Sequence, residues 1–378
     1  MSAAAPSTAE RIRHTAAGRS LTDAIVQLLA GPLADAPGAA GHHTLLAVCP
    51  NSETVTRAAL LAAQEANAPL LYAATLNQVD RDGGYTGWTP ADLAAFVADE
   101  AERLGVDVPI VLGLDHGGPW KKDVHAQADL PYEETLAEVM RSLDACIDAG
   151  YELLHLDPTV DRRLPPGTPV PVEDIVARTV DLLDHAEAYR KEQGRGPLAY
   201  EVGTEEAGGG LQTTERFASF LDQLEAALDR HDLPQPSFVV GDVGTRLDTD
   251  HFNPVRAEQL TEQSKRIGAL IKGHYTDSVA HPEAYPLSGM GGANVGPGLS
   301  AAEYAALMDL VTLEQRVGRD SGFKESLRTA VVDSGRWKKW RRPEESELPF
   351  DELAPERQEW LVETGSRYVW THPDVEAA

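Results

Sequence analysis

Val111-Leu-Gly-Leu-Asp-His-Gly-Gly-Pro-Trp120 is the segment from which the fold can be inferred. Its apolar run is typical of a buried strand, and an aspartate and a histidine stand at the end of that run. A barrel of parallel strands presents catalytic and metal-binding side chains in this way. A second interpretation is a plain turn, in which Asp115 caps a helix and His116 is only a polar residue. The neighbouring elements must decide between the two.

Apolar strands alternate with amphipathic helices on both sides of this segment. Strands are predicted over Thr44–Cys49, Leu70–Ala74, Ile110–Leu114, Tyr151–Leu156, Leu198–Val202, Phe238–Val240, Leu270–Lys272 and Ala293–Val295. Helices are predicted over Ser52–Asn67, Thr89–Leu104, Tyr132–Ala149, Val172–Gln193, Thr213–His231, Pro254–Ile267 and Ala301–Arg319. This alternation indicates an α/β protein with a parallel sheet. About eight such units favour a closed (β/α)8 TIM barrel over an open sheet, and no glycine-rich dinucleotide fingerprint follows the first strand.

Three segments are expected along the chain. Residues 1–40 should form an N-terminal helix and a linker, residues 41–321 the barrel, and residues 322–378 a C-terminal helical and aromatic extension. Four of the six tryptophans lie in this extension beside basic residues, a composition that could bind nucleic acid. The acidic remainder of the chain instead favours packing of the extension against the barrel or a partner subunit.

The composition narrows the classes of partner. The 378 residues carry a formal net charge of -27, which disfavours nucleic acid and anionic membranes because it repels phosphates at long range. A small phosphorylated ligand in a locally basic pocket remains compatible with it. Cys49 and Cys146 lie far apart in apolar elements, so we expect free thiols in a reducing compartment. With no signal sequence and no apolar run of membrane-spanning length, the expected location is the cytoplasm.

Polar residues recur where the predicted strands end. They are Asn77, Gln78, Asp115, His116, His155, Asp157, Glu205, His251, His274, Asn294 and Gly296. Because the carboxyl ends of barrel strands meet at one face, these residues should lie close together. Imidazole nitrogens and carboxylate oxygens are suited to a divalent transition metal. We therefore expect a divalent metal on His116, His251 and His274, with Zn²⁺ as first choice and Mn²⁺ as the alternative.

The remaining residues of this face have several roles open to them. Asp115, Asp157 and Glu205 can serve as ligands, orienting groups or proton-transfer groups beside a Lewis acid. Substrate contacts are expected from Asn77, Gln78, Tyr85, Asn294 and Gly296. Gly296-Pro-Gly298 precedes a predicted helix, where backbone N–H groups either hold a phosphate or are simply capped. The lysine pair Lys121 and Lys122 can neutralise a ligand anion or be solvated.

Taken together, these motifs resemble the Z-subunit family of D-tagatose-1,6-bisphosphate aldolase (GatZ/KbaZ-like). The resemblance rests on Asn77-Gln-Val79, Gly83-Gly-Tyr-Thr-Gly87, Asp115-His116, His155-Leu-Asp157, Gly203-Thr-Glu205, Asp250-His251, His274, Val295-Gly-Pro297, Trp337-Lys-Lys339 and Arg367-Tyr-Val-Trp-Thr-His372. It implies a class II aldolase-type barrel in which Asp115 is the general acid/base, the three histidines bind the metal, and Asp157 and Glu205 are further carboxylates. The chain departs from that pattern at Tyr275-Thr-Asp277, which replaces a glycine/serine loop and should repel a phosphate.

Two functions follow from the residues and the resemblance. The first is a metal-dependent aldolase-type lyase or sugar 4-epimerase that acts on a tagatose- or fructose-like ketose or ketose phosphate by retro-aldol C3–C4 chemistry. The alternative is a non-catalytic subunit that stabilises a catalytic aldolase subunit, and a homo-oligomer is compatible with both. Some members of the family resembled are described as kinases, but this chain has no glycine–lysine motif that cradles phosphates.

Overall fold

Eight parallel strands close into a barrel in which each strand pairs with the next and β8 pairs with β1. The computed structural model describes the whole chain except residues 1–15, 17, 31–42, 166, 205–212 and 248–250. The strands are β1 (Leu45–Val48), β2 (Leu70–Thr75), β3 (Ile110–Gly117), β4 (Leu153–Leu156), β5 (Ala199–Gly203), β6 (Phe238–Val240), β7 (Leu270–Gly273) and β8 (Gly292–Val295). The predicted (β/α)8 TIM barrel is therefore confirmed.

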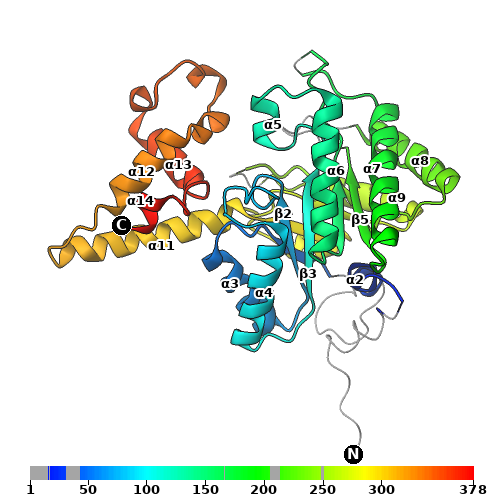
Figure 1. Cartoon of the computed structure of the whole chain (residues 1–378), viewed down its shortest axis with the longest axis horizontal. Coiled ribbons are helices and arrows are strands. Elements are labelled where there is room, and N and C mark those ends of the chain that lie inside the picture. Colours follow the sequence, from blue (N-terminus) through cyan, green and yellow to red (C-terminus); the bar gives the residue numbers. More distant parts are fainter. Residues whose placement is uncertain (1–15, 17, 31–42, 166, 205–212, 248–250) are drawn as a thin grey trace, which may run out of the picture.

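Helices follow the strands and surround the barrel (Figure 1). They are α3 (Glu53–Ala66), α4 (Pro90–Leu104), α6 (Tyr132–Asp148), α7 (Val172–Glu192), α8 (Thr214–His231), α9 (Pro254–Ser264) and α11 (Pro297–Arg316). Two short helices, α5 (Asp123–Gln127) and α10 (Ala284–Leu287), were not expected from the sequence. Local chemistry fixes several boundaries: Thr89 and Asp92 form a reciprocal capping box at the start of α4.

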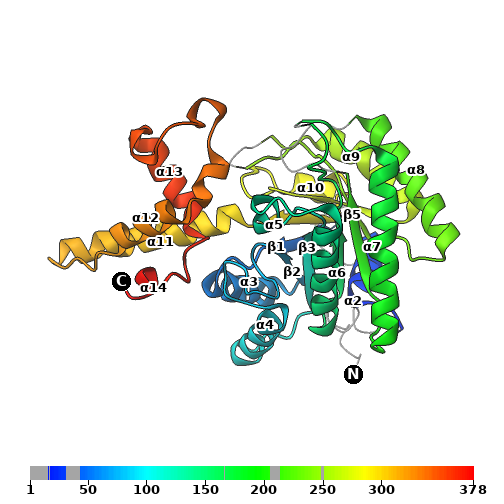
Figure 2. The ribbon, with the colours of Figure 1, turned by 45° about the horizontal axis from the view of Figure 1, so that its top comes forward.

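The lower end of the barrel, where the strands begin, is covered by helix α2 (Leu21–Ala30), as Figures 1 and 2 show. Ile25 and Leu29 of α2 share one buried apolar cluster with the strand residues Leu45, Ala47, Leu71, Ala73, Val111, Leu153, Ala199, Phe238 and Leu270. Side chains along a strand alternate between its two faces, so the residues two positions further on also point into the barrel. Those next residues include His155, Glu201 and Lys272, and a polar layer thus lies above the apolar ones.

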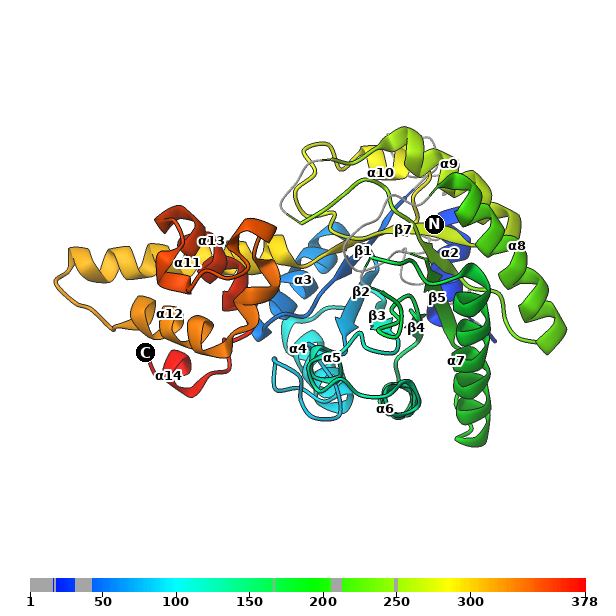
Figure 3. The ribbon, with the colours of Figure 1, turned by 90° about the horizontal axis from the view of Figure 1, so that it is seen from above.

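The C-terminal extension packs on α11, which reaches away from the barrel (Figure 3). It contains α12 (Phe323–Ser334), η2 (Arg336–Trp340), α13 (Pro355–Ser366) and α14 (Pro373–Glu376). Its own apolar core comprises Tyr304, Leu327, Ala330, Val331, Trp337, Phe350, Leu353, Leu361, Val362, Val369 and Val375. The extension also touches loops at the upper end of the barrel, because Thr371 donates a hydrogen bond to the carbonyl of Tyr85 (3.1 Å) and Arg336 pairs with Asp123 (3.2 Å).

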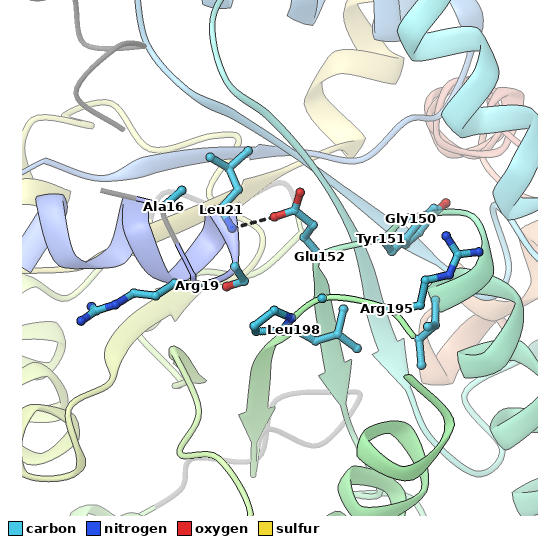
Figure 4. A pocket seen from close by; sticks show the side chains of 12 residues that line it. Ala16, Arg19, Leu21, Gly150, Tyr151, Glu152, Arg195 and Leu198 are labelled. Atoms are coloured by element: carbon cyan, nitrogen blue, oxygen red, sulfur yellow. Dashed lines mark hydrogen bonds between the residues drawn. The ribbon is translucent and has the colours of Figure 1, made fainter. Parts of the chain in front are cut away.

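A cavity of about 500 Å³ opens at the lower end of the barrel (Figure 4). Its wall includes Arg19, Glu152 and Arg195, and the Leu21 N–H donates to Glu152 Oε2 at 2.7 Å. Glu152 precedes β4 and Arg195 precedes β5, so the cavity lies at the face where this fold builds stability rather than catalysis.

Two sequence expectations about the whole chain can be compared with the structure. Cys49 and Cys146 are both free thiols, as predicted. Among the described helices, none combines the length and the apolar character that crossing a membrane requires.

Candidate active site

A β-bulge brings the Asp–His pair of β3 to the upper end of the barrel. Leu114 pairs with Leu154 and Gly117 with Leu156, so Asp115 and His116 together stand opposite His155 alone. Neighbours in a regular strand point to opposite faces. The extra residue, with His116 at a φ of 55°, turns both side chains toward the same space. The His116 ring consequently lies 4.9 Å from the His155 ring and 4.8 Å from the His274 ring.

Backbone strain gathers at the same end of the barrel. His116, Trp120 and Tyr275 are three of the six non-glycine residues with positive φ in the described chain. They lie at the ends of β3 and β7, whereas Asn67 and Asp232 merely cap helices. Such conformations cost free energy and persist mainly where a functional site requires them.

Four buried side chains of this layer form a compact group: Asp115, His155, Glu201 and His274. His155 Nδ1 lies 3.0 Å from Asp115 Oδ1 and 3.5 Å from Glu201 Oε1. His274 Nε2 lies 3.7 Å and 3.5 Å from the same two oxygens. A tetrahedral zinc site with bonds of about 2.0–2.1 Å separates its ligand atoms by about 3.3 Å. The spacing therefore fits one divalent cation.

The hydrogen bonding of His155 is incomplete among the described residues. Its Nδ1 accepts the His116 N–H at 3.2 Å and also faces Asp115 Oδ1. A ring nitrogen carries either a lone pair or a proton. Nδ1 therefore cannot both accept the His116 N–H and donate a hydrogen bond to Asp115 Oδ1. Its Nε2 is buried and has no hydrogen-bond partner among the described residues. The described protein groups thus leave Nε2 open to a ligand. Nδ1, the atom whose spacing fits a cation, can bind one only when it does not accept the His116 N–H.

The electrostatics of the group also favour a cation. Burial lowers the pKa of His274 to about 4 despite the opposing charge of Asp115, so its imidazole is neutral and its lone pair available near pH 7. Burial opposes ionisation of Asp115, but the charges of His116 and His274 outweigh it and hold the pKa of Asp115 well below its usual range. Burial is likewise overcome at Glu201, where the charge of Lys272 brings the pKa to about 2. The Lys272 ammonium lies 2.7 Å and 2.9 Å from the two Glu201 oxygens.

A second group stands beside the first and contains His116, Asp157 and Lys121. Asp157 Oδ2 is 2.5 Å from His116 Nδ1 and 2.7 Å from Lys121 Nζ. Burial lowers the pKa of His116, but the charges of Asp115 and Asp157 outweigh it and raise that pKa overall. The His116 side chain is 30% exposed, whereas that of Asp115 is only 4% exposed. His116 therefore faces the opening, and Asp157 orients its ring.

Gly118 allows the segment after β3 to lie against the backbone of Asp157, which follows β4. A Cβ at position 118 would lie 1.8 Å from the Asp157 carbonyl oxygen. We expect Gly118→Ala to destabilise the protein by about 1–3 kcal/mol, because the backbone of one strand end must move. Urea denaturation measures this change. Gly196→Ala is the matched control, since a Cβ there meets nothing within 4 Å; equal stability of the two variants would contradict the steric argument.

The N-terminus of α11 is capped by the protein itself. The N–H groups of Gly296 and Gly298 donate to Asp277 Oδ1 at 2.6 Å and 2.8 Å. Of the two interpretations of Gly296-Pro-Gly298, the structure thus shows the cap. Asp277 belongs to the Tyr275-Thr-Asp277 segment that was expected to repel phosphate, and its carboxylate occupies the donors that a phosphate would use.

Three of the five predicted substrate-binding residues, Gln78, Tyr85 and Gly296, form a network around Asn51. Gln78 Nε2 and the Tyr85 hydroxyl donate to Asn51 Oδ1 at 2.6 Å and 3.0 Å, and Asn51 Nδ2 donates to the Gly296 carbonyl at 3.0 Å. Asn77 lies apart from this network and joins the loop after β3 through Lys121 O and Asp123 N. Asn294 Nδ2 donates to Asp115 Oδ2 at 3.2 Å, which orients that carboxylate.

Some residues that the sequence analysis expected in the site lie elsewhere in the structure, and one lies outside the described residues. His251 is exposed and belongs to neither of these two groups of side chains. Glu205 lies outside the described residues. The lysine pair is not solvated: Lys121 pairs with Asp157, and Lys122 pairs with Asp80 and Asp82 at 2.6 Å and 2.8 Å. Both ammonium groups are buried because these carboxylates offset their charge.

Three polar residues of the barrel interior were not assigned a role in the site by the sequence analysis. His155 was noted at a strand end but given no role, and Glu201 and Lys272 were absorbed into predicted strands. A period-2 analysis could have found the two charged residues. In Ala199-Tyr-Glu-Val-Gly203 and Leu270-Ile-Lys-Gly273, each takes an inward position in an otherwise apolar run.

Comparison with known proteins agrees with this architecture. Residues 33–378 match the family model described as D-tagatose-1,6-bisphosphate aldolase subunit GatZ/KbaZ-like. The fold is similar to the crystal structure of a "probable tagatose 6 phosphate kinase" from Sinorhizobium meliloti 1021, with a TM-score of 0.70 and 26% sequence identity over 89% of this chain and 85% of that one. A weaker likeness, to the YdjI aldolase from Escherichia coli K12, has a TM-score of 0.41 and 11% identity over 88% of each chain. The match over residues 33–378 shows that the chain belongs to the GatZ/KbaZ-like family of D-tagatose-1,6-bisphosphate aldolase subunits.

Proposed function

We propose that the protein is a metal-dependent enzyme that cleaves the C3–C4 bond of a tagatose- or fructose-like ketose or ketose phosphate. The observation that carries the proposal is the spacing of the donor atoms of Asp115, His155, Glu201 and His274. These four residues would hold the cation, with Zn²⁺ as first choice and Mn²⁺ as the alternative. A divalent cation supplies a Lewis acid for the negative charge that develops on the sugar oxygens during cleavage.

The protein groups provide the proton transfers. His116 takes the proton of the C4 hydroxyl through Nε2, because its Nδ1 is bonded to Asp157. The C3–C4 bond then breaks, its electron pair passes to C3 as an enediolate, and C4 becomes an aldehyde. Release of the aldehyde, followed by transfer of the proton from His116 to C3 of the enediolate, completes an aldolase reaction. Re-addition to the other face of the aldehyde, with return of the proton from His116, inverts C4 and completes an epimerase reaction.

This assignment exchanges two roles relative to the sequence-based one. Asp115 was expected to transfer the proton and His116 to bind the metal. Asp115 is buried against His155, His274 and Asn294, which suits a carboxylate that holds a cation. His116 is the more exposed of the two and faces the opening of the barrel.

Turnover tests the proposal directly. Purified protein loaded with Zn²⁺ or Mn²⁺ should convert fructose, tagatose or one of their phosphates, with either a triose product or the C4 epimer detected by chromatography. His116→Asn should retain the metal and lower kcat by about 10²–10⁴-fold, the usual contribution of a general acid/base. If the protein is inactive with both metals, the proposed enzymatic function is wrong. If His116→Asn loses the metal, His116 is a metal ligand, as the sequence analysis expected.

A non-catalytic subunit is the second candidate, and one structural observation favours it. Leu310, Leu313 and Val317 of the α11 region are 57%, 53% and 73% exposed. They are spaced three and four residues apart, so they share one helix face that a partner subunit could cover. Size-exclusion chromatography with a catalytic aldolase subunit separates the candidates. A stable complex that raises the activity of that subunit, with no activity of this chain alone, would favour the stabilising role.

A further inference from the structure

Arg367 carries a buried charge that pairs with no carboxylate among the described residues. The residue follows α13 directly and is 6% exposed. Among the described residues, its guanidinium makes one hydrogen bond, to the Tyr368 hydroxyl at 3.4 Å, and no carboxylate lies within 4.0 Å. Arginines are rarely buried without a partner, because removing the charge from water costs several kcal/mol. Lys121, Lys122 and Lys272, by contrast, are buried beside carboxylates.

The surroundings of Arg367 are aromatic and locally positive. Its guanidinium lies 5.2 Å from the Trp340 ring and 5.1 Å from the Tyr368 ring. Arg336 lies 4.8 Å from the same Tyr368 ring and 5.4 Å from the Tyr85 ring. Arg336 and Lys339 share the single carboxylate of Asp123, so with Arg367 the cations outnumber it. In a strongly acidic chain, this local excess of positive charge favours a small anion.

A continuous set of contacts joins Arg367 to the active site. The rings of Tyr368 and Tyr85 meet edge to face, with centroids 5.1 Å apart. The Tyr85 hydroxyl bonds to Asn51, which in turn bonds to the Gly296 carbonyl at the end of β8. Burial raises the pKa of Asp277, and the charge of Arg367 is close enough to oppose that rise.

We propose that Arg367, together with the hydroxyl group of Tyr368, binds an anionic group of the sugar substrate, either a phosphate monoester or a carboxylate. The guanidinium fork matches both anions. Asp277 already occupies the backbone donors at α11, so the anion is recognised by the C-terminal extension instead. This inference rests on the proposed function for the identity of the ligand as a sugar.

Binding measurements test the proposal without requiring turnover. Isothermal calorimetry on the full-length, Zn²⁺-loaded protein compares fructose, fructose 6-phosphate and fructuronate. One of the two anionic sugars should bind about 10- to 100-fold more tightly than fructose, the value of a hydrogen bond to a charged group. Whichever sugar is preferred identifies phosphate or carboxylate as the anion. Arg367→Met should abolish the preference, and Arg367→Lys should retain part of it.

Lys338→Met is the matched control, because it removes the charge of an exposed residue in the same extension. It should keep the full preference. The inference is overturned if the wild-type protein binds neither anionic sugar more tightly than fructose. This test does not depend on whether Arg367→Met folds. Survival of the preference in Arg367→Met or Arg367→Gln would also overturn it. Absence of turnover alongside an Arg367-dependent preference would contradict only the proposed reaction.

Discussion

Replacing His274 by alanine should remove the metal and the activity together. His274 Nε2 is one of the four donor atoms spaced for a single cation, and its lone pair is available because burial keeps the imidazole neutral. Losing a residue that only hydrogen-bonds to a metal ligand lowers metal affinity by about 10- to 100-fold. Because His274 would bind the metal directly, we expect the affinity for Zn²⁺ to fall by more than about 100-fold. A Lewis acid contributes several kcal/mol to the transition state, so kcat should fall by about 10³-fold or more. Metal analysis of the purified variant and a competition titration with a chelator measure the first effect.

His251→Ala is the control for this experiment and separates two ligand sets. The sequence predicts His116, His251 and His274 as the metal ligands, whereas the geometry supports Asp115, His155, Glu201 and His274. His251 is exposed, so its replacement should change neither stability nor metal content. A loss of metal in His251→Ala equal to that in His274→Ala would favour the three-histidine set.

Breaking the pair between Lys272 and Glu201 should have the largest effect on stability. Both side chains are 1% exposed. Lys272→Met leaves the Glu201 carboxylate buried without its cation, and such a change costs about 3–5 kcal/mol. Denaturation in guanidinium chloride, with a chelator present so that no metal compensates, measures this loss.

The double variant Lys272→Met/Glu201→Gln tests the cause of that loss. It removes both charges, so it should be considerably more stable than Lys272→Met alone. Arg266 and Asp222 provide an exposed pair for comparison, with side chains 53% and 57% exposed. Arg266→Met should change the unfolding free energy by less than about 1 kcal/mol. A double variant no more stable than Lys272→Met would show that the two charges do not stabilise each other.

Much of the fold could be predicted because its signals are local. Apolar runs of four to eight residues between amphipathic helices specify a parallel barrel, and the predicted strand Phe238–Val240 matches β6 in full. The end of β3 was harder. Ile110–Leu114 was predicted, but the strand continues to Gly117 through a bulge, and a bulge depends on the partner strand rather than on its own residues.

The site could be predicted only in part, for a similar reason. Asp115 and His274 were found because each stands where an apolar run ends. Glu201 and Lys272 were missed because a charge within a strand is normally unfavourable, and it becomes acceptable here only through a partner 71 positions away in sequence. Arg367 was missed for another reason, since nothing in its local sequence shows that it is buried near Tyr85.

Helix α2 and the apolar layers above it close the lower end of the barrel, so ligands approach the candidate site from the upper end. The two products of C3–C4 cleavage must leave a barrel that is closed at one end in order, the one nearer the upper end first. For the reaction that we propose, an outer fragment that departs quickly yields a cleavage product. An outer fragment that stays long enough to rotate meets its partner again and forms a new stereocentre. Aldolase and epimerase would then differ in residence time rather than in catalytic groups, so a change in the loops at the opening could convert one activity into the other.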